Sequence, residues 1–206
     1  MKKWMSLFDL CPIRPGTRND RATRITAMSY LSDCPDKEQR MEQRLLNSSE
    51  YILLRGKDSG GFAGLLQMVD TNPVSRITGQ AIVDLYNSVP KSHRKNAVFL
   101  MNTVTLNELS RSLDSDSRAL LSYKGDGTFM LMDQPIVLCN AMPFISKGSV
   151  PILFGDFGKV SIEDCGRDEL QQEPCEGNPG TQQYTLTGYM DCMLEEQLAV
   201  RGIRIV

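Results

Sequence analysis

The chain has 206 residues, of which 41% are hydrophobic, and its formal net charge is −2 at neutral pH. This length is enough for one large domain or two small ones with a sizeable core. The near-neutral balance excludes a dominant affinity for polyanions, and no apolar run approaches the ~20 residues that a membrane-spanning helix needs. We therefore expect a globular protein with no membrane partner.

The positive charge is concentrated at the N-terminus. Residues 1–24 carry only Asp9 and Asp20 against six basic side chains, which are Lys2, Lys3, Arg14, Arg18, Arg21 and Arg24. Prolines and a glycine interrupt any long periodicity before residue 36, so we predict an arm over residues 1–35. Two interpretations stay open for it: a partly ordered tail, or an arm that packs on a neighbouring subunit through Trp4 and Phe8. The opening MKKWMSLFDL is charged like a signal peptide but lacks a small-residue cleavage site, so we expect it to remain in the working protein.

The cysteines give no support for a metal site. None of the six forms a C-x-x-C pair, and His93 is the only histidine in the chain. We expect no metal and no cofactor, a reducing compartment, and a buried thiol at Cys139 within its apolar run. Whether Cys165 and Cys175 meet across a loop is left open by the sequence.

The clearest long helix is predicted from Asp36 to Arg55. Asp36 is placed to cap it and to pair with Arg40 four residues later, and Gly56 is a plausible C-terminal cap. The glycine-rich stretch after it, residues 56–67, lacks the G-x-x-x-x-G-K-[S/T] pattern of a phosphate loop.

The middle of the chain alternates helices and strands. A helix capped by Thr78 should end before Pro90, a buried strand should span 97–101, and a second helix should begin near Asn102. Segments 120–123 and 128–132 flank Gly125-Asp126-Gly127 and predict a hairpin. A polar loop is expected over 164–183, followed by strands over 184–195 and 198–206, with a possible bulge at Gly202. The order of elements indicates an α+β fold.

The most informative stretch is PIVLCNAMPFISKGSVPILFGDF, residues 135–157. Two short runs of bulky apolar side chains, 136–139 and 150–154, predict strands covered on both faces. Gly155-Asp156 ends the second run as a turn, so Asp156 is expected to serve the backbone rather than catalysis. His93 lies in PKSHRKN, where we expect an exposed basic turn, and the acidic clusters 164–169 and 195–196 are expected to be solvated. The chain is therefore not predicted to be an enzyme.

The same stretch resembles the most recognisable segment of the major capsid proteins of tailed phages, the Hong Kong 97-like family. The residues that carry this resemblance are Pro135, Asn140, Met142, Pro143, Phe154, Gly155 and Asp156. A second match lies upstream, where Val89-Pro90, Arg94, Asn96-Ala97 and Leu100-Met101-Asn102 follow the family pattern of helix, strand and helix.

The resemblance implies a shell subunit with a peripheral domain, formed by the long helix and the returning strands (36–60 and 183–206), and an axial domain (61–182). It implies self-assembly into pentamers, hexamers and an icosahedral head in the virion, built in the bacterial host cytoplasm. It also implies scaffold or portal proteins as partners and weak, non-specific contact with packaged double-stranded DNA. Family members usually carry a longer N-arm and an extended hairpin loop before the long helix, and only 35 residues precede it here.

Three alternatives remain open at this point. The first is an encapsulin-like compartment subunit, which would share the fold, and the second is a decayed capsid remnant that no longer assembles. The third is a small α+β hydrolase or nucleotide-binding enzyme.

Overall fold

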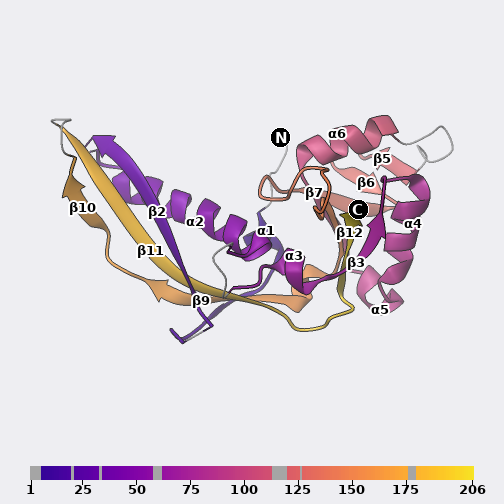
Figure 1. The fold of residues 1–206 in the computed structure, drawn as a ribbon, viewed down its shortest axis with the longest axis horizontal. Coiled ribbons are helices and arrows are strands. Elements are labelled where there is room, and N and C mark those ends of the chain that lie inside the picture. The colour runs from indigo at the N-terminus through magenta and orange to yellow at the C-terminus, as the bar shows by residue number, and fades with distance from the viewer. Residues whose placement is uncertain are drawn as a thin grey trace.

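A computed structural model describes residues 6–19, 21–32, 34–57, 62–112, 120–125, 127–175 and 180–206. The helices of these residues are α1 (Leu7–Leu10), α2 (Lys37–Arg55), α3 (Leu65–Met68), α4 (Gly79–Ser88), α5 (Lys91–Arg94), α6 (Thr103–Ser112) and the 3-10 helix η2 (Phe157–Lys159). Two mixed sheets divide the chain into an elongated lobe and a compact lobe, which lie at opposite ends of the molecule (Figure 1).

The elongated lobe is a five-stranded sheet with α2 packed along it. Its strands are β1 (Ile13–Pro15), β2 (Thr23–Ser32), β9 (Val160–Arg167), β10 (Gln171–Pro174) and β11 (Thr181–Leu194). The 14-residue β11 pairs with β2 along one edge. Because a strand has only two edges, β10 and β9 share the other edge of β11, one after the other. Strand β1 extends this side through a parallel pairing with β9.

The compact lobe is a seven-stranded sheet flanked by α4 and α6. Its strands in spatial order are β3 (Asp70–Val74), β12 (Val200–Ile205), β8 (Ile152–Gly155), β4 (Val98–Met101), β7 (Gln134–Leu138), β6 (Phe129–Leu131) and β5 (Leu121–Tyr123). The apolar runs that become β7 and β8 are therefore not neighbours, because β4 lies between them.

Both faces of this central sheet are covered, as the lack of alternation in the sequence predicts. Phe99, Ile152 and Phe154 enter a core beneath α4 and α6, whereas Leu100 and Leu153 enter the core shared with the elongated lobe. The side chains of a strand point alternately to its two faces, so a strand covered on both sides must be apolar throughout.

The predicted helices are confirmed, with small differences at their caps. Helix α2 begins after Asp36, which makes no capping hydrogen bond through its side chain but pairs with Arg40 at 2.7 Å. Gly56 closes the helix with φ +81°, a conformation that favours glycine. Thr78 caps α4 by accepting from the backbone N–H of Ala81 at 3.2 Å.

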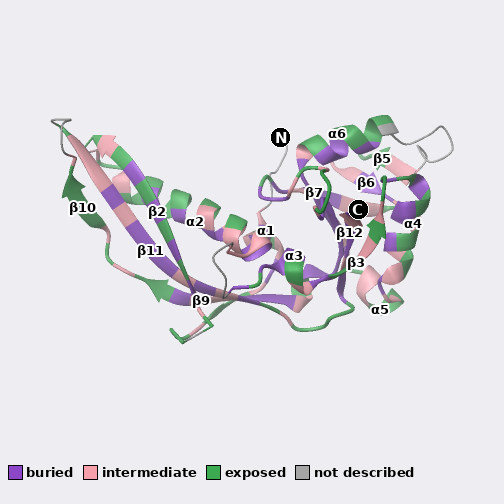
Figure 2. Ribbon diagram, in the orientation of Figure 1, coloured by how far each residue is buried: buried purple, intermediate pink, exposed green. Residues whose placement is uncertain are grey.

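The predicted arm over residues 1–35 is wrong for the described residues between 6 and 32. Leu7 is fully buried beneath α2, and β2 pairs with β11 over its whole length. The alternation is present in the sequence, where apolar Ile25 and Ala27 alternate with Arg24 and Thr26. In the structure, Ile25 and Ala27 are buried and Arg24, Thr26 and Met28 are exposed, which is typical of a half-covered strand (Figure 2).

The C-terminal half differs from the prediction in three ways. The polar segment 164–183 is not one loop, because β9 continues to Arg167 and β10 lies within it, exposed along its length (Figure 2). The predicted return of 183–206 to the long helix holds for β11 only, since β12 joins the sheet of the compact lobe. Gly202 is in register with both neighbours and makes no bulge; an added Cβ would lie 2.8 Å from Val150 Cγ1.

Candidate functional site

The residues of the 135–157 motif lie at the junction between the compact core and the rest of the chain. Phe154 is fully buried and stacks on Phe99, with ring centroids 4.3 Å apart, and on Tyr86 at 5.3 Å. Met142 is also fully buried, Pro143 and Pro135 are half-buried, and the Asn140 side chain is exposed. Most of these motif residues therefore contribute to packing, and few of them present polar groups at the surface.

Gly155 and Asp156 connect the end of β8 to η2. A Cβ at Gly155 would lie 2.1 Å from the backbone oxygen of Ala199, so only glycine fits between β8 and β12. The Asp156 backbone N–H donates to the same oxygen at 2.9 Å, and its carboxylate accepts from the Gly158 N–H at 3.0 Å. Asp156 therefore caps η2, as expected for a turn residue.

Asn102 holds the loop that follows β7. Its side-chain amide donates to the carbonyls of Asn140 and Met142, each at 3.3 Å, and its amide oxygen accepts from the Val104 N–H at 2.9 Å. One buried side chain thus starts α6 and fixes the middle of the motif. The sequence marks Asn102 as part of a family pattern, but only the fold brings it to Asn140.

The two lobes meet at the C-terminal half of α2. Arg55 Nε donates to the carbonyl of Ala141 at 2.9 Å, and Glu50 accepts from the Leu7 N–H at 2.5 Å. An open cleft of about 370 Å³ lies at this joint, lined by Ser6, Asn47, Glu50, Tyr51, Leu138, Asn140 and Ala141.

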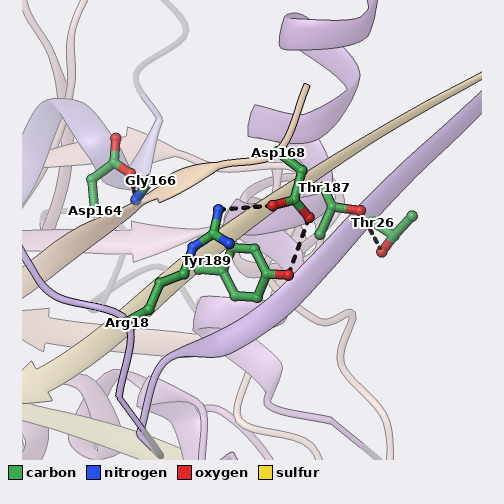
Figure 3. Close-up of polar contacts among 7 residues, drawn as sticks. All are labelled: Arg18, Thr26, Asp164, Gly166, Asp168, Thr187 and Tyr189. Atoms are coloured by element: carbon green, nitrogen blue, oxygen red, sulfur yellow. Dashed lines mark hydrogen bonds and ion pairs between the residues drawn. The ribbon is translucent and has the colours of Figure 1, made fainter. Parts of the chain in front are cut away.

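Two of the basic residues of the predicted arm make side-chain contacts within their own chain. Arg14 pairs with Glu195 at 3.0 Å. Arg18 pairs with Asp168 at 2.8 Å and lies over the ring of Tyr189, whose hydroxyl donates to the same carboxylate at 3.1 Å (Figure 3). Arg18 therefore fastens the segment before β2 to the sheet.

The other residues predicted to dock on a neighbouring subunit differ in how far they are buried. Arg21 and Arg24 are exposed, whereas Phe8 is half-buried against the core of the elongated lobe. Trp4 lies outside the described residues. A docking role on a neighbouring subunit stays a prediction for this set, and among its described members Arg21 and Arg24 are the exposed ones.

His93 is not the exposed residue that its basic surroundings predict. Its side chain is 13% exposed, and Nε2 lies 3.3 Å from Glu196, which also pairs with Lys159 at 2.6 Å. The hydrogen bond from Lys159 lowers the pKa of Glu196. The Lys159–Glu196 ion pair joins η2 to the segment after β11, and the His93 contact brings α5 to the same carboxylate, so both contacts are structural.

The buried thiols are unsuited to nucleophilic chemistry. Burial raises the pKa of Cys139 to about 12, with the Glu50 carboxylate adding to the rise. Burial likewise raises the pKa of Cys192 to about 12, with help from Asp191. All six cysteines are free, so Cys165 and Cys175 form no disulfide. Protonated, buried thiols are inert at neutral pH.

The described residues contain neither a candidate metal site nor a candidate membrane-spanning helix. These residues contain no group of three or more histidine, cysteine, aspartate or glutamate side chains placed to hold a metal ion. None of their helices combines the length and the apolar character needed to cross a membrane.

Comparison with known proteins identifies the family. The sequence model of the phage capsid family matches residues 38–191, about three quarters of the chain. No curated protein gives a significant match.

Solved structures support the same assignment. The capsid of an empty GTA particle superposes with a TM-score of 0.72 at 16% identity, covering 100% of this chain and 91% of that one. A structure from Gordonia phage Cozz superposes with a TM-score of 0.59 at 12% identity, covering 89% of this chain and 70% of that one. The SrpI encapsulin of Synechococcus elongatus PCC 7942 superposes with a TM-score of 0.61 at 16% identity, covering 90% of this chain and 74% of that one. The chain therefore belongs to the phage capsid family, has the Hong Kong 97-like fold, and is a structural capsid protein.

Proposed function

We propose that this protein is the major capsid protein of a phage or prophage, and that it self-assembles into the icosahedral head that encloses DNA. The family match over residues 38–191 carries this proposal. In it, the elongated lobe is the peripheral domain and the compact lobe is the axial domain, whose loops would meet around the five-fold and six-fold axes. The described ion pairs and the buried, protonated thiols are consistent with a structural role without catalysis.

The proposed setting follows from that role. The protein would be assembled in the cytoplasm of a bacterial host and reside in the virion, with scaffold or portal proteins as further partners. Contact with the packaged double-stranded DNA would be weak and non-specific, because the chain has a net charge of −2.

The encapsulin-like compartment is the second candidate, and the likeness to the Synechococcus elongatus encapsulin favours it. The two candidates predict different contents. A phage head holds nucleic acid after packaging, whereas a compartment subunit closes around protein cargo.

Electron microscopy of the purified full-length chain in negative stain tests the proposal directly. We expect rings, pentamers, hexamers or closed shells, with light scattering reporting masses far above the 23.1 kDa of one subunit. A 23.1 kDa monomer at every protein concentration and salt condition would refute self-assembly. Absorbance ratios of particles isolated from the native host would separate a DNA-filled head from a protein-filled compartment.

A further inference from the structure

The charges of α2 are separated to its two flanks. At 100° per residue, its buried stripe of Met41, Leu45 and Ser49 divides the helix lengthwise. The cations and the acids then lie on opposite sides of the stripe, Lys37, Arg40, Arg44 and Arg55 on one flank and Glu38, Glu42 and Glu50 on the other.

A groove follows the basic flank where α2 faces β2. It has a volume of about 460 Å³, and its lining residues are Thr26, Ala27, Met28, Arg44, Asn47 and Ser48. No acidic side chain stands in that lining. Arg24 and Tyr30 are exposed on the same strand, Tyr30 by 61% and Met28 by 49%. We call Arg24, Met28 and Tyr30 of β2, together with Arg44 on the neighbouring flank of α2, the basic edge.

A second groove follows the opposite flank, between α2 and the end of β9. It measures about 280 Å³, and its lining residues are Glu38, Glu42, Arg167, Asp168, Glu169, Leu170 and Leu186. Arg167 is paired with Glu42 at 3.0 Å, and Asp168 is paired with Arg18 at 2.8 Å. Glu38 and Glu169 are exposed here, and Glu173 is exposed on the adjoining β10. We call Glu38, Glu169 and Glu173 the acidic edge.

The two edges face away from each other. Strand β2 borders β11 on one side and β10 borders it on the other, so the basic edge and the acidic edge bound the elongated lobe at opposite sides (Figure 1). Opposite charges on opposite sides of one subunit cannot meet within that subunit. They can meet between copies arranged head to tail, and such heterologous contacts generate closed rings when the rotation between neighbouring copies closes.

We propose that the basic edge of one subunit docks on the acidic edge of the next copy of this chain. The inference rests on the proposed self-assembly and names the surfaces that would carry it. Like edges would repel, so this charge pattern also selects the direction of docking.

A second copy fits the basic edge better than DNA does. The edge mixes its cations with the apolar surface of Met28 and Tyr30, and its groove continues into the neutral Asn47 and Ser48. A phosphate backbone would call for a longer row of cations. The complementary surface is already present on the other side of the same lobe.

Charge reversal with complementation tests the proposal on the full-length chain. The first variant carries Arg24→Glu and Arg44→Glu, which makes both edges acidic. The second carries Glu38→Lys and Glu169→Lys, which makes both edges basic. A control carries Lys91→Glu and Lys95→Glu, two reversals on and beside α5, away from either edge. Circular dichroism and thermal melting verify folding, and light scattering with size-exclusion chromatography measures association at two salt concentrations.

The proposal predicts that each edge variant alone loses at least tenfold in association at low salt, and that the control associates like wild type. An equimolar mixture of the two edge variants should recover association, because each contact between unlike variants joins opposite charges again. Normal assembly of both variants alone would overturn the proposal, as would failure of the folded variants to recover when mixed. Selective loss of DNA binding by the first variant, with unchanged assembly, would assign the basic edge to DNA instead. A wild-type chain that never associates would refute the proposed self-assembly itself.

Discussion

The packing around Phe154 requires a large side chain, whereas the packing around the adjacent Gly155 leaves no room for any side chain. Phe154 fills space, because its ring stacks between Phe99 and Tyr86 in the core of the compact lobe. Gly155 leaves space, because the Ala199 oxygen lies where a Cβ would be. Replacing Phe154 with a small residue would leave a cavity in the core. Adding a side chain at residue 155 would push β8 away from β12.

Replacing Phe154 with alanine should lower the free energy of unfolding by about 3–5 kcal/mol, through lost transfer energy and the cavity that remains. Urea denaturation followed by circular dichroism measures this change. Phe144→Ala is the matched control, since Phe144 is 56% exposed and its loss should change stability by no more than about 0.5 kcal/mol. Equal stability of the two variants would contradict the placement of Phe154 in the core.

Cys139 should make the protein sensitive to alkaline pH. Its pKa rises from 9.0 to about 12 on folding because burial disfavours the thiolate. Below pH 9 both states hold the proton, and the stability is fully present. Between pH 9 and 12 the unfolded chain releases the proton first, so stability should fall by up to about 1.4 kcal/mol per pH unit. Cys139→Ala should flatten this part of the stability profile relative to its own value at pH 7, whereas an unchanged slope would exclude Cys139 as a source.

At the scale of elements, the N-terminal segment belongs to the elongated lobe. Ser6 forms a capping box with Asp9 at the start of α1, Leu7 is fully buried, and β1 pairs in parallel with β9. Removing these elements would uncover one side of the core beneath α2. They therefore contribute to the stability of the single subunit, whatever they do between subunits.

Leu7→Ala should destabilise the isolated subunit by about 2–5 kcal/mol, because a fully buried leucine is lost from a packed site. Ile13→Ala serves as the control, since Ile13 is 53% exposed on the adjoining β1. Chemical denaturation under conditions that keep the subunit monomeric measures both. If Leu7→Ala melts like wild type but assembles poorly, the segment acts as an arm between subunits after all.

At the scale of the whole molecule, the chain passes between the lobes more than once, and one of the connecting segments follows β11. Strand β11 lies in the elongated sheet and β12 lies in the compact sheet, with 195–199 between them. Arg55 of α2 donates to the Ala141 carbonyl across the joint between the lobes. Each lobe therefore presents its own outer surfaces while their relative position is held at the centre.

The melting temperature should rise with protein concentration, because association stabilises the folded subunit by mass action. Differential scanning calorimetry over a wide range of concentration measures the shift. The charge-reversed variants of either edge should show a smaller shift than the Lys91/Lys95 control. A melting temperature independent of concentration would contradict assembly under those conditions.

The sequence by itself determined the elements whose signals are local. Helix α2 follows from its periodic apolar side chains and Gly56, helix α4 from the Thr78 cap, and the β5–β6 hairpin from its glycine turn. The two apolar runs of the 135–157 motif required strands covered on both faces, because no single sheet face could bury them. The resemblance to the capsid family also lies in the residues of this motif, since their order along the chain is enough to indicate it.

Only the tertiary structure decided the polar strands and the partners of the charges. Strands β3 and β10 have little apolar content, and they form because β12 and β11 offer open edges for pairing. The same holds for Arg14 and Arg18, which pair with Glu195 and Asp168 from the far end of the sequence. Backbone pairing and ion pairing depend on which segments meet in space, and that information lies in the whole chain rather than in any one stretch of it.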